Sequence, residues 1–102
     1  MKKIKWAILG AARVNEKLIP AITKSKQGEL VAIGSRRDNS AAECVKKYAP
    51  EHINNIECYK GFDLILNNKD IDAIYIPLSN EEHTETALKA IRNKKHVLIE
   101  KP

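Results

Sequence analysis

An apolar segment that runs directly into a turn of small residues constrains the fold of this chain most. Residues 4–9 are largely apolar on both alternating faces, which indicates a parallel strand covered on both sides. The next apolar residues follow at helical spacing, so the turn between them opens a helix; they are Val14, Leu18, Ala21 and Ile22. In α/β proteins such a junction commonly binds a nucleotide phosphate, because free N–H groups at the helix start face the anion.

The rest of the chain alternates strands with helices. Further strands are predicted at 29–34, 55–59, 71–77 and 96–99, with helices or short helical segments between them. This alternation predicts an α/β fold, a Rossmann-type doubly wound parallel sheet of about five strands in the order 3-2-1-4-5. The ligand crevice of such a sheet lies at the carboxyl ends of strands one and four.

Composition narrows the class of protein. With 102 residues, the chain is predicted to form one domain. The net charge of +5 does not favour nucleic acid, because the lysines are scattered and aromatic residues make up only 5%. Two isolated cysteines argue against a disulfide framework or a metal site and suggest a cytoplasmic protein. No segment reaches the ~20 apolar residues of a membrane span, so no membrane is expected as a partner.

The turn after the first strand resembles a degraded G-x-G-x-x-G motif. Its candidate cofactor-binding residues are Gly10, Ala11, Ala12, Arg13 and Val14. Ala12 and Asn15 stand where the second and third glycines would be. Small residues still allow a pyrophosphate to approach, and Arg13 could add a phosphate contact. A plain tight turn between strand and helix is the alternative interpretation.

Residues at the end of the second strand bear on the choice of cofactor. NAD-specific domains place an acid there for the ribose 2′-hydroxyl, but this chain has Ser35, Arg36 and Arg37. A hydroxyl and two guanidinium groups suit a 2′-phosphate, so NADP is preferred over NAD. The absence of an acid also counts against a methyltransferase that uses adenosylmethionine. Two surface arginines on a loop are the alternative.

Two more segments fall at the same predicted edge of the sheet. Pro77, Leu78 and Asn80 follow the fourth strand, and Glu100 and Lys101 follow the fifth. A lysine in that place could hydrogen-bond a substrate hydroxyl or carbonyl and move a proton as hydride transfers.

Four segments together resemble the Gfo/Idh/MocA oxidoreductases, the family of glucose–fructose oxidoreductase and inositol dehydrogenase. The resemblance covers nearly the whole chain and rests on residues 6–14, 31–37, 74–83 and 95–102. The third segment is similar to the Pro-Asn-x-x-His run of the family, and the fourth to its Glu-Lys-Pro ending. This chain differs from the family pattern at Asn15, Ser79 and Lys94, and Lys94 replaces the usual glycine before the last strand.

The resemblance implies an enzyme that transfers a hydride between NADP or NAD and a sugar, cyclitol or related alcohol or ketone. It implies that Lys101 is catalytic and that Pro77, Asn80 and His83 line the cofactor crevice. The turn is most similar to that of the dihydrodiol and xylose dehydrogenases, many of which use NADP.

The resemblance also implies that residues 1–102 are only the amino-terminal NAD(P)-binding domain. Members of the family continue into a second α/β domain that binds the small-molecule substrate, and the full-length parent is expected to be a homo-oligomer. A non-catalytic module that binds and senses a dinucleotide is the alternative function.

Overall fold

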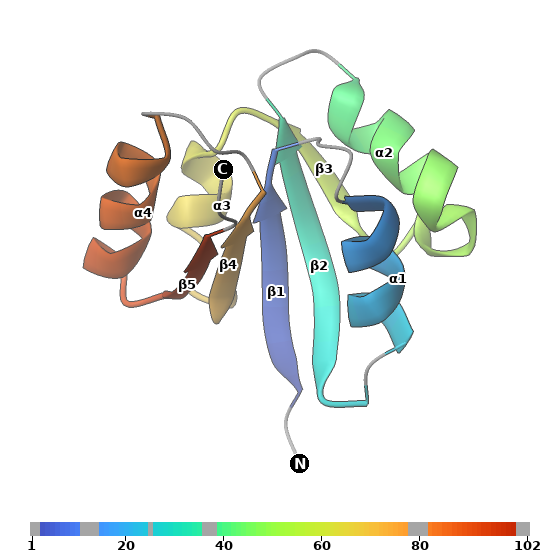
Figure 1. Cartoon of the computed structure of the whole chain (residues 1–102), viewed down its shortest axis with the longest axis horizontal. Helices are drawn as coiled ribbons and strands as arrows, with labels where there is room; N and C mark the ends of the chain where they lie inside the picture. Colours follow the sequence, from blue (N-terminus) through green and yellow to red (C-terminus); the bar gives the residue numbers. More distant parts are fainter. Residues whose placement is uncertain (1–2, 11–14, 25, 36–38, 78–81, 100–102) are drawn as a thin grey trace.

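The computed structural model describes residues 3–10, 15–24, 26–35, 39–77 and 82–99. They form a five-stranded parallel sheet in the order β3-β2-β1-β4-β5 (Figure 1). The strands are β1 (Ile4–Leu9), β2 (Gly28–Ser35), β3 (Glu57–Lys60), β4 (Ala73–Ile76) and β5 (His96–Ile99). The predicted fold class and strand order are therefore confirmed.

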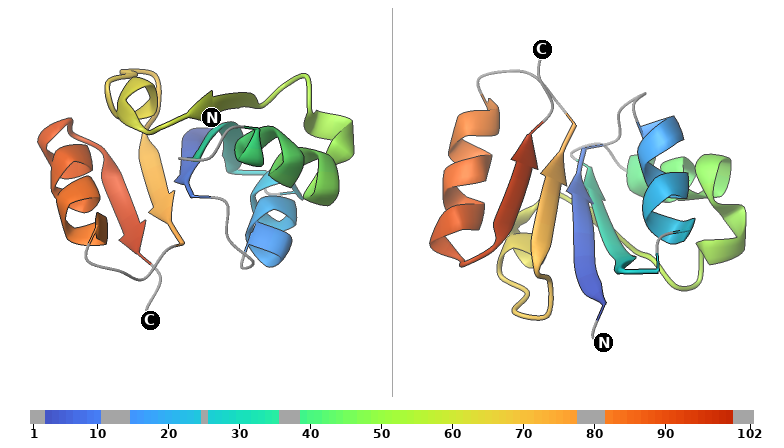
Figure 2. Two further views of the ribbon diagram at one scale, coloured as in Figure 1. Left: turned by 90° about the horizontal axis from the view of Figure 1, so that it is seen from above. Right: turned by 60° about the horizontal axis from the view of Figure 1, so that its bottom comes forward.

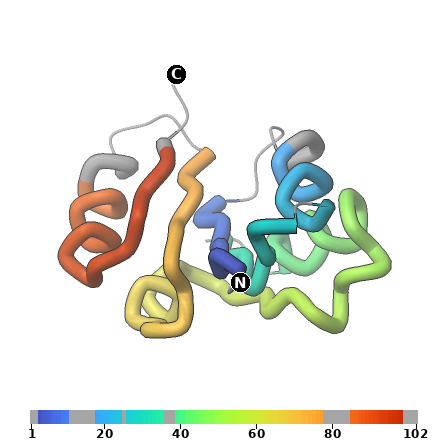
Figure 3. The backbone as a smooth tube through the Cα atoms, turned by 90° about the horizontal axis from the view of Figure 1, so that it is seen from below, coloured from blue at the N-terminus to red at the C-terminus, as the bar shows by residue number. Residues whose placement is uncertain are grey.

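Helices cover both faces of the sheet (Figure 2). One face carries α1 (Asn15–Lys24) and α2 (Ser40–Tyr48), and the other carries α3 (Asp63–Leu66) and α4 (Glu82–Arg92). A short 3-10 turn, η1 (Pro50–His52), follows α2. In the view from below, α4 lies beside β5, and α1 and α2 lie on the opposite side of β1 (Figure 3). Because helices cover both faces, ligands can reach the sheet at the amino or carboxyl ends of its strands.

Two hydrophobic cores lie on opposite faces of the sheet. In β1, Ala7, Ile8 and Leu9 are all fully buried, and successive side chains enter different cores. Ile8 packs with the α1 and α2 side chains, whereas Ala7 and Leu9 pack with those of α3 and α4. Because both faces of β1 are covered, successive residues of the strand are largely apolar.

A β-bulge in β2 changes which of the two cores its side chains enter. Trp6 pairs with Leu30 while Ala7 pairs with Ala32, so Val31 is the extra residue of β2. Leu30 and Ile33 consequently belong to the same core although three positions separate them. In a regular strand, residues three apart point to opposite faces. The bulge was not predicted from the sequence.

Gly34 allows the loop after β3 to approach β2 closely. A Cβ atom at Gly34 would lie 2.6 Å from the carbonyl oxygen of Gly61 and 3.0 Å from Cδ1 of Ile65. The adjacent Ser35 carbonyl accepts a hydrogen bond of 2.6 Å from the Gly61 N–H. Only glycine fits at position 34, because the Gly61 carbonyl cannot easily move away. The hydrogen bond from the Gly61 N–H to Ser35 holds that loop in place.

Substitution of Gly34 by alanine should lower the free energy of unfolding by about 3 kcal/mol, because the added methyl group overlaps the Gly61 carbonyl. Urea unfolding followed by circular dichroism measures this change. Gly61→Ala is the matched control: a Cβ there meets no atom within 4 Å, and only its φ of 86° is unfavourable. The control should lose about 1 kcal/mol. Equal losses in the two variants would contradict the steric explanation.

Candidate functional site

The carboxyl ends of four adjacent strands meet at one edge of the sheet. Leu9 at the end of β1 pairs with Gly34 of β2, and Ile76 at the end of β4 pairs with Ile99 of β5. Because β1 also pairs with β4, the residues that follow these strands start from one edge (Figure 1). This is the edge at which parallel α/β sheets bind their ligands. We call it the carboxyl edge.

Gly10 starts the turn that leads from β1 to α1. Its φ of 131° lies where side-chain-bearing residues are strained. Its N–H donates a hydrogen bond of 2.8 Å to the Gly34 carbonyl, which continues the pairing of β1 with β2 by one residue. Helix α1 then begins at Asn15. A glycine conformation at this strand–helix junction fits the approach of a dinucleotide pyrophosphate.

Two more predicted site residues lie at the carboxyl edge. Ser35 is the last residue of β2, is only 5% exposed and is held by the hydrogen bond from Gly61 to its carbonyl. Pro77 follows β4 and is buried. The described residues of three predicted segments, Gly10, Ser35 and Pro77, thus lie at one edge of the sheet, at the ends of β1, β2 and β4.

The other predicted residues fall largely outside the described residues. This applies to Ala11, Ala12, Arg13, Val14, Arg36, Arg37, Leu78, Asn80, Glu100 and Lys101. His83 lies within the first turn of α4, and only its backbone is described. Their side-chain roles remain predictions from the sequence.

The cysteines provide no reactive thiolate at this site. Cys44 is buried, and the thiol of half-buried Cys58 donates to the Ile56 carbonyl over 3.7 Å. Burial, with a smaller effect of nearby Cys44, raises the pKa of the Cys58 thiol. The thiol is therefore protonated at neutral pH. Among the described residues no group of His, Cys, Asp and Glu side chains could hold a metal ion, and no described helix is long and apolar enough to cross a membrane.

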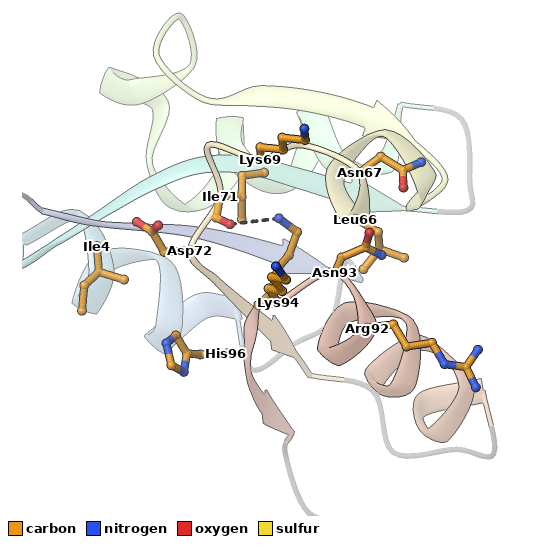
Figure 4. Close-up of a pocket in the computed structure, with 11 residues that line it drawn as sticks. Ile4, Leu66, Asn67, Lys69, Ile71, Asp72, Arg92, Asn93, Lys94 and His96 are labelled. Atoms are coloured by element: carbon orange, nitrogen blue, oxygen red, sulfur yellow. Dashed lines mark hydrogen bonds between the residues drawn. The ribbon is translucent and has the colours of Figure 1, made fainter.

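A cavity of about 740 Å³ opens at the opposite edge of the sheet, where β4 and β5 begin (Figure 4). We call it the amino-edge cavity. The loops before β4 and β5 supply most of its lining, which consists of Ile4, Leu66, Asn67, Lys69, Ile71, Asp72, Arg92, Asn93, Lys94, Lys95 and His96. Sequence analysis missed this site, because its lysines stand at the ends of different elements and look like solvated surface residues.

Lys95 is the buried cation of this cavity. The residue is 6% exposed, and its ammonium donates to the carbonyl of Ile71 at 2.9 Å (dashed line in Figure 4) and to that of Asn68. Burial lowers the pKa of Lys95, and the carboxylate of Asp72 opposes that shift. The two hydrogen bonds fasten the start of β5 to the loop that precedes β4.

A comparison with protein-family models matches residues 4–102 to the Gfo/Idh/MocA model, described as an oxidoreductase family with an NAD-binding Rossmann fold. The match covers all the described strands and helices. It agrees with the glycine turn and the strand order found in the structure.

Individual relatives cover the same region. The chain is 32% identical to a dTDP-3,4-didehydro-2,6-dideoxy-alpha-D-glucose 3-reductase from Actinomadura kijaniata, over 97% of this chain and 28% of the relative. It is 33% identical to a 1,5-anhydro-D-fructose reductase from Ensifer adhaerens, over 96% and 28%. The crystal structure of KijD10, a 3-ketoreductase from A. kijaniata in complex with NADP and TDP-benzene, superposes with a TM-score of 0.85 at 31% identity, over 99% and 30%. The chain therefore spans less than a third of the length of these relatives.

Proposed function

The chain belongs to the Gfo/Idh/MocA family of oxidoreductases with an NAD-binding Rossmann fold, and on that premise we propose that it is the NADP-preferring domain of a longer dehydrogenase or reductase. The substrate class is a sugar, cyclitol or related alcohol or ketone, held mainly by a carboxyl-terminal domain that follows residue 102. The relatives named as sugar reductases and the NADP in the KijD10 complex support this assignment.

The observation that carries the proposal is the convergence of strand ends at the carboxyl edge. Gly10, Ser35 and Pro77 follow or end three different strands, yet the parallel pairing brings them to one side of the sheet. A dinucleotide needs this arrangement, because its pyrophosphate, ribose and nicotinamide contact successive strand ends. When bound, the nicotinamide cofactor donates or accepts the hydride.

Lys101 is the proposed catalytic residue. In the sequence it follows by two residues the last residue of β5, the strand that pairs with β4. During reduction its ammonium donates a proton to the carbonyl oxygen of the substrate as hydride reaches the carbonyl carbon. During oxidation the neutral amine accepts the hydroxyl proton.

Arg36 and Arg37 supply the proposed preference for NADP. Arginine offers a fixed fork of charged donors that matches the oxygens of a 2′-phosphate. Buried Ser35 anchors the start of this segment at the end of β2.

Replacement of Lys101 by alanine in the longer protein should lower kcat by roughly 10²- to 10⁴-fold, because the proton donor is lost. The dissociation constant of NADPH should stay within about threefold, since the hydride-transfer cofactor is bound mainly by the strand ends. Steady-state kinetics on a panel of sugars and cyclitols, together with calorimetric titration of NADPH, measure the two quantities. Lys24→Ala, at the exposed end of α1, is the control and should retain turnover.

The isolated chain of 102 residues should bind dinucleotide but show no turnover. Turnover by this chain alone would contradict the proposal that a second domain is needed to bind the substrate. A longer protein that binds NADPH and oxidises or reduces nothing would instead support the dinucleotide-sensing module.

Replacement of Arg36 by alanine should weaken NADP binding by roughly tenfold or more while leaving NAD binding unchanged, because only NADP carries the 2′-phosphate. Calorimetric titration of the wild type and the variant with both cofactors measures the selectivity. The exposed α2 residue Lys46, changed to alanine, controls for the loss of one positive charge. An equal loss for NAD and NADP would rule out Arg36 as the residue that reads the 2′-phosphate.

A further inference from the structure

The amino-edge cavity has a strong excess of positive charge. Its lining contains the four basic side chains of Lys69, Arg92, Lys94 and Lys95 and the single carboxylate of Asp72. That carboxylate already accepts a hydrogen bond of 2.9 Å from the N–H of Lys5 in β1. Like charges brought into one cavity repel one another, so the arrangement favours an anionic ligand.

The end of α4 accounts for only part of this charge. Cations near the last turn of a helix interact favourably with its carbonyls, which explains Arg92. Lys69 comes instead from the loop between α3 and β4, 25 positions away in the sequence from Lys94. Two separate loops therefore place lysines around the same cavity (Figure 4).

Lys94 occupies a backbone conformation that disfavours lysine. Its φ is 62°, in the left-handed region where glycine is preferred at the end of a helix. The N–H groups of Lys94 and Lys95 donate to the carbonyls of Ile91 and Ala90, at 2.9 Å and 3.0 Å, so the helix ends in a Schellman motif. Glycine would make the same backbone hydrogen bonds without strain. The lysine side chain at this position is thus unfavourable for the fold and adds a charge to the cavity.

Lys95 adds a donor at the inner side of the cavity. An ammonium has three hydrogens, and the carbonyls of Asn68 and Ile71 take two of them. Within the part of the chain that the structure describes, the third hydrogen is left for a ligand. Ile4, Leu66 and Ile71 also line the cavity, and Ile4 is the exposed one of the three.

We propose that the amino-edge cavity is a second ligand site, which binds the phosphate group of a small molecule between Lys69, Lys94 and Lys95. A phosphate dianion matches several ammonium groups around one cavity better than a single carboxylate does, because it carries more charge and more acceptor oxygens. The volume of about 740 Å³ exceeds that of the phosphate and leaves room for an organic portion against the apolar residues. The site lies at the opposite edge of the sheet from the dinucleotide and does not depend on the proposed dehydrogenase activity.

An NMR titration of the ¹⁵N-labelled chain with inorganic phosphate tests the proposal and separates the two edges of the sheet. Saturable shifts are expected for the amides of residues 67–72 and 92–96. Phosphate bound at the cofactor site would shift Gly10 and Gly34 instead. A second titration uses a sugar phosphate. Tighter binding of the ester supports a ligand whose organic portion contacts the apolar lining, and equal affinity supports free phosphate as the ligand.

Two substitutions of Lys94 separate strain from charge. Lys94→Gly should raise the melting temperature by roughly 3–8 °C, because the left-handed strain is relieved, and weaken phosphate binding at this edge by roughly threefold or more. Lys94→Gln removes the charge but keeps the strain, so it should weaken binding without raising the melting temperature. Lys69→Gln should weaken binding similarly, whereas the exposed α2 control Lys46→Gln should not.

The proposal is overturned if phosphate shifts only amides at the carboxyl edge, or if the shifts at residues 92–96 do not saturate. It is also overturned if Lys94→Gly raises the melting temperature while phosphate affinity in the Lys94 and Lys69 variants equals that of the wild type.

Discussion

The pairing of β1 with its two neighbours is the interaction on which the rest of this structure depends. β1 is central in the sheet, and its side chains enter both hydrophobic cores. A shift of one residue in its register would move the side chains of Ala7 and Ile8 each to the opposite core. The bulge at Val31 lets β2 follow this register while Leu30 and Ile33 stay in one core. The same pairing fixes the position of Gly10, where the turn between β1 and α1 starts.

Most of the fold could be predicted because its determinants are local. The apolar pattern of 4–9 and 71–77 identifies buried parallel strands, and the small-residue turn identifies the first β–α junction. The right-handed connection between parallel strands then restricts the strand order. The bulge could not be predicted in this way, since it depends on how β2 fits two cores at once. Gly34 is a similar case: its need for glycine comes from Gly61, 27 positions later in the chain.

In the candidate sites, too, residues with local sequence signals could be predicted and those that depend on tertiary contacts could not. Gly10 and Ser35 could be placed at the carboxyl edge because each directly follows or ends a recognisable strand. The amino-edge cavity could not be found, because its lysines come from two loops that are adjacent only after β4 and β5 have paired. The strain at Lys94 is also invisible in the sequence pattern. It depends on where α4 ends and on the Schellman hydrogen bonds that close the helix.

The two edges of the sheet attract anions for different reasons. At the carboxyl edge a helix begins after the Gly10 turn, so the positive end of the α1 dipole favours an anion there. At the amino edge α4 ends, and its carbonyls present the negative end of a dipole. Backbone groups there repel an anion, so any attraction must come from side chains. The Schellman motif satisfies carbonyls at the end of α4, and Lys69, Lys94 and Lys95 add positive charge around the cavity. The left-handed Lys94 therefore adds positive charge where the helix carbonyls are negative, at a cost in backbone strain.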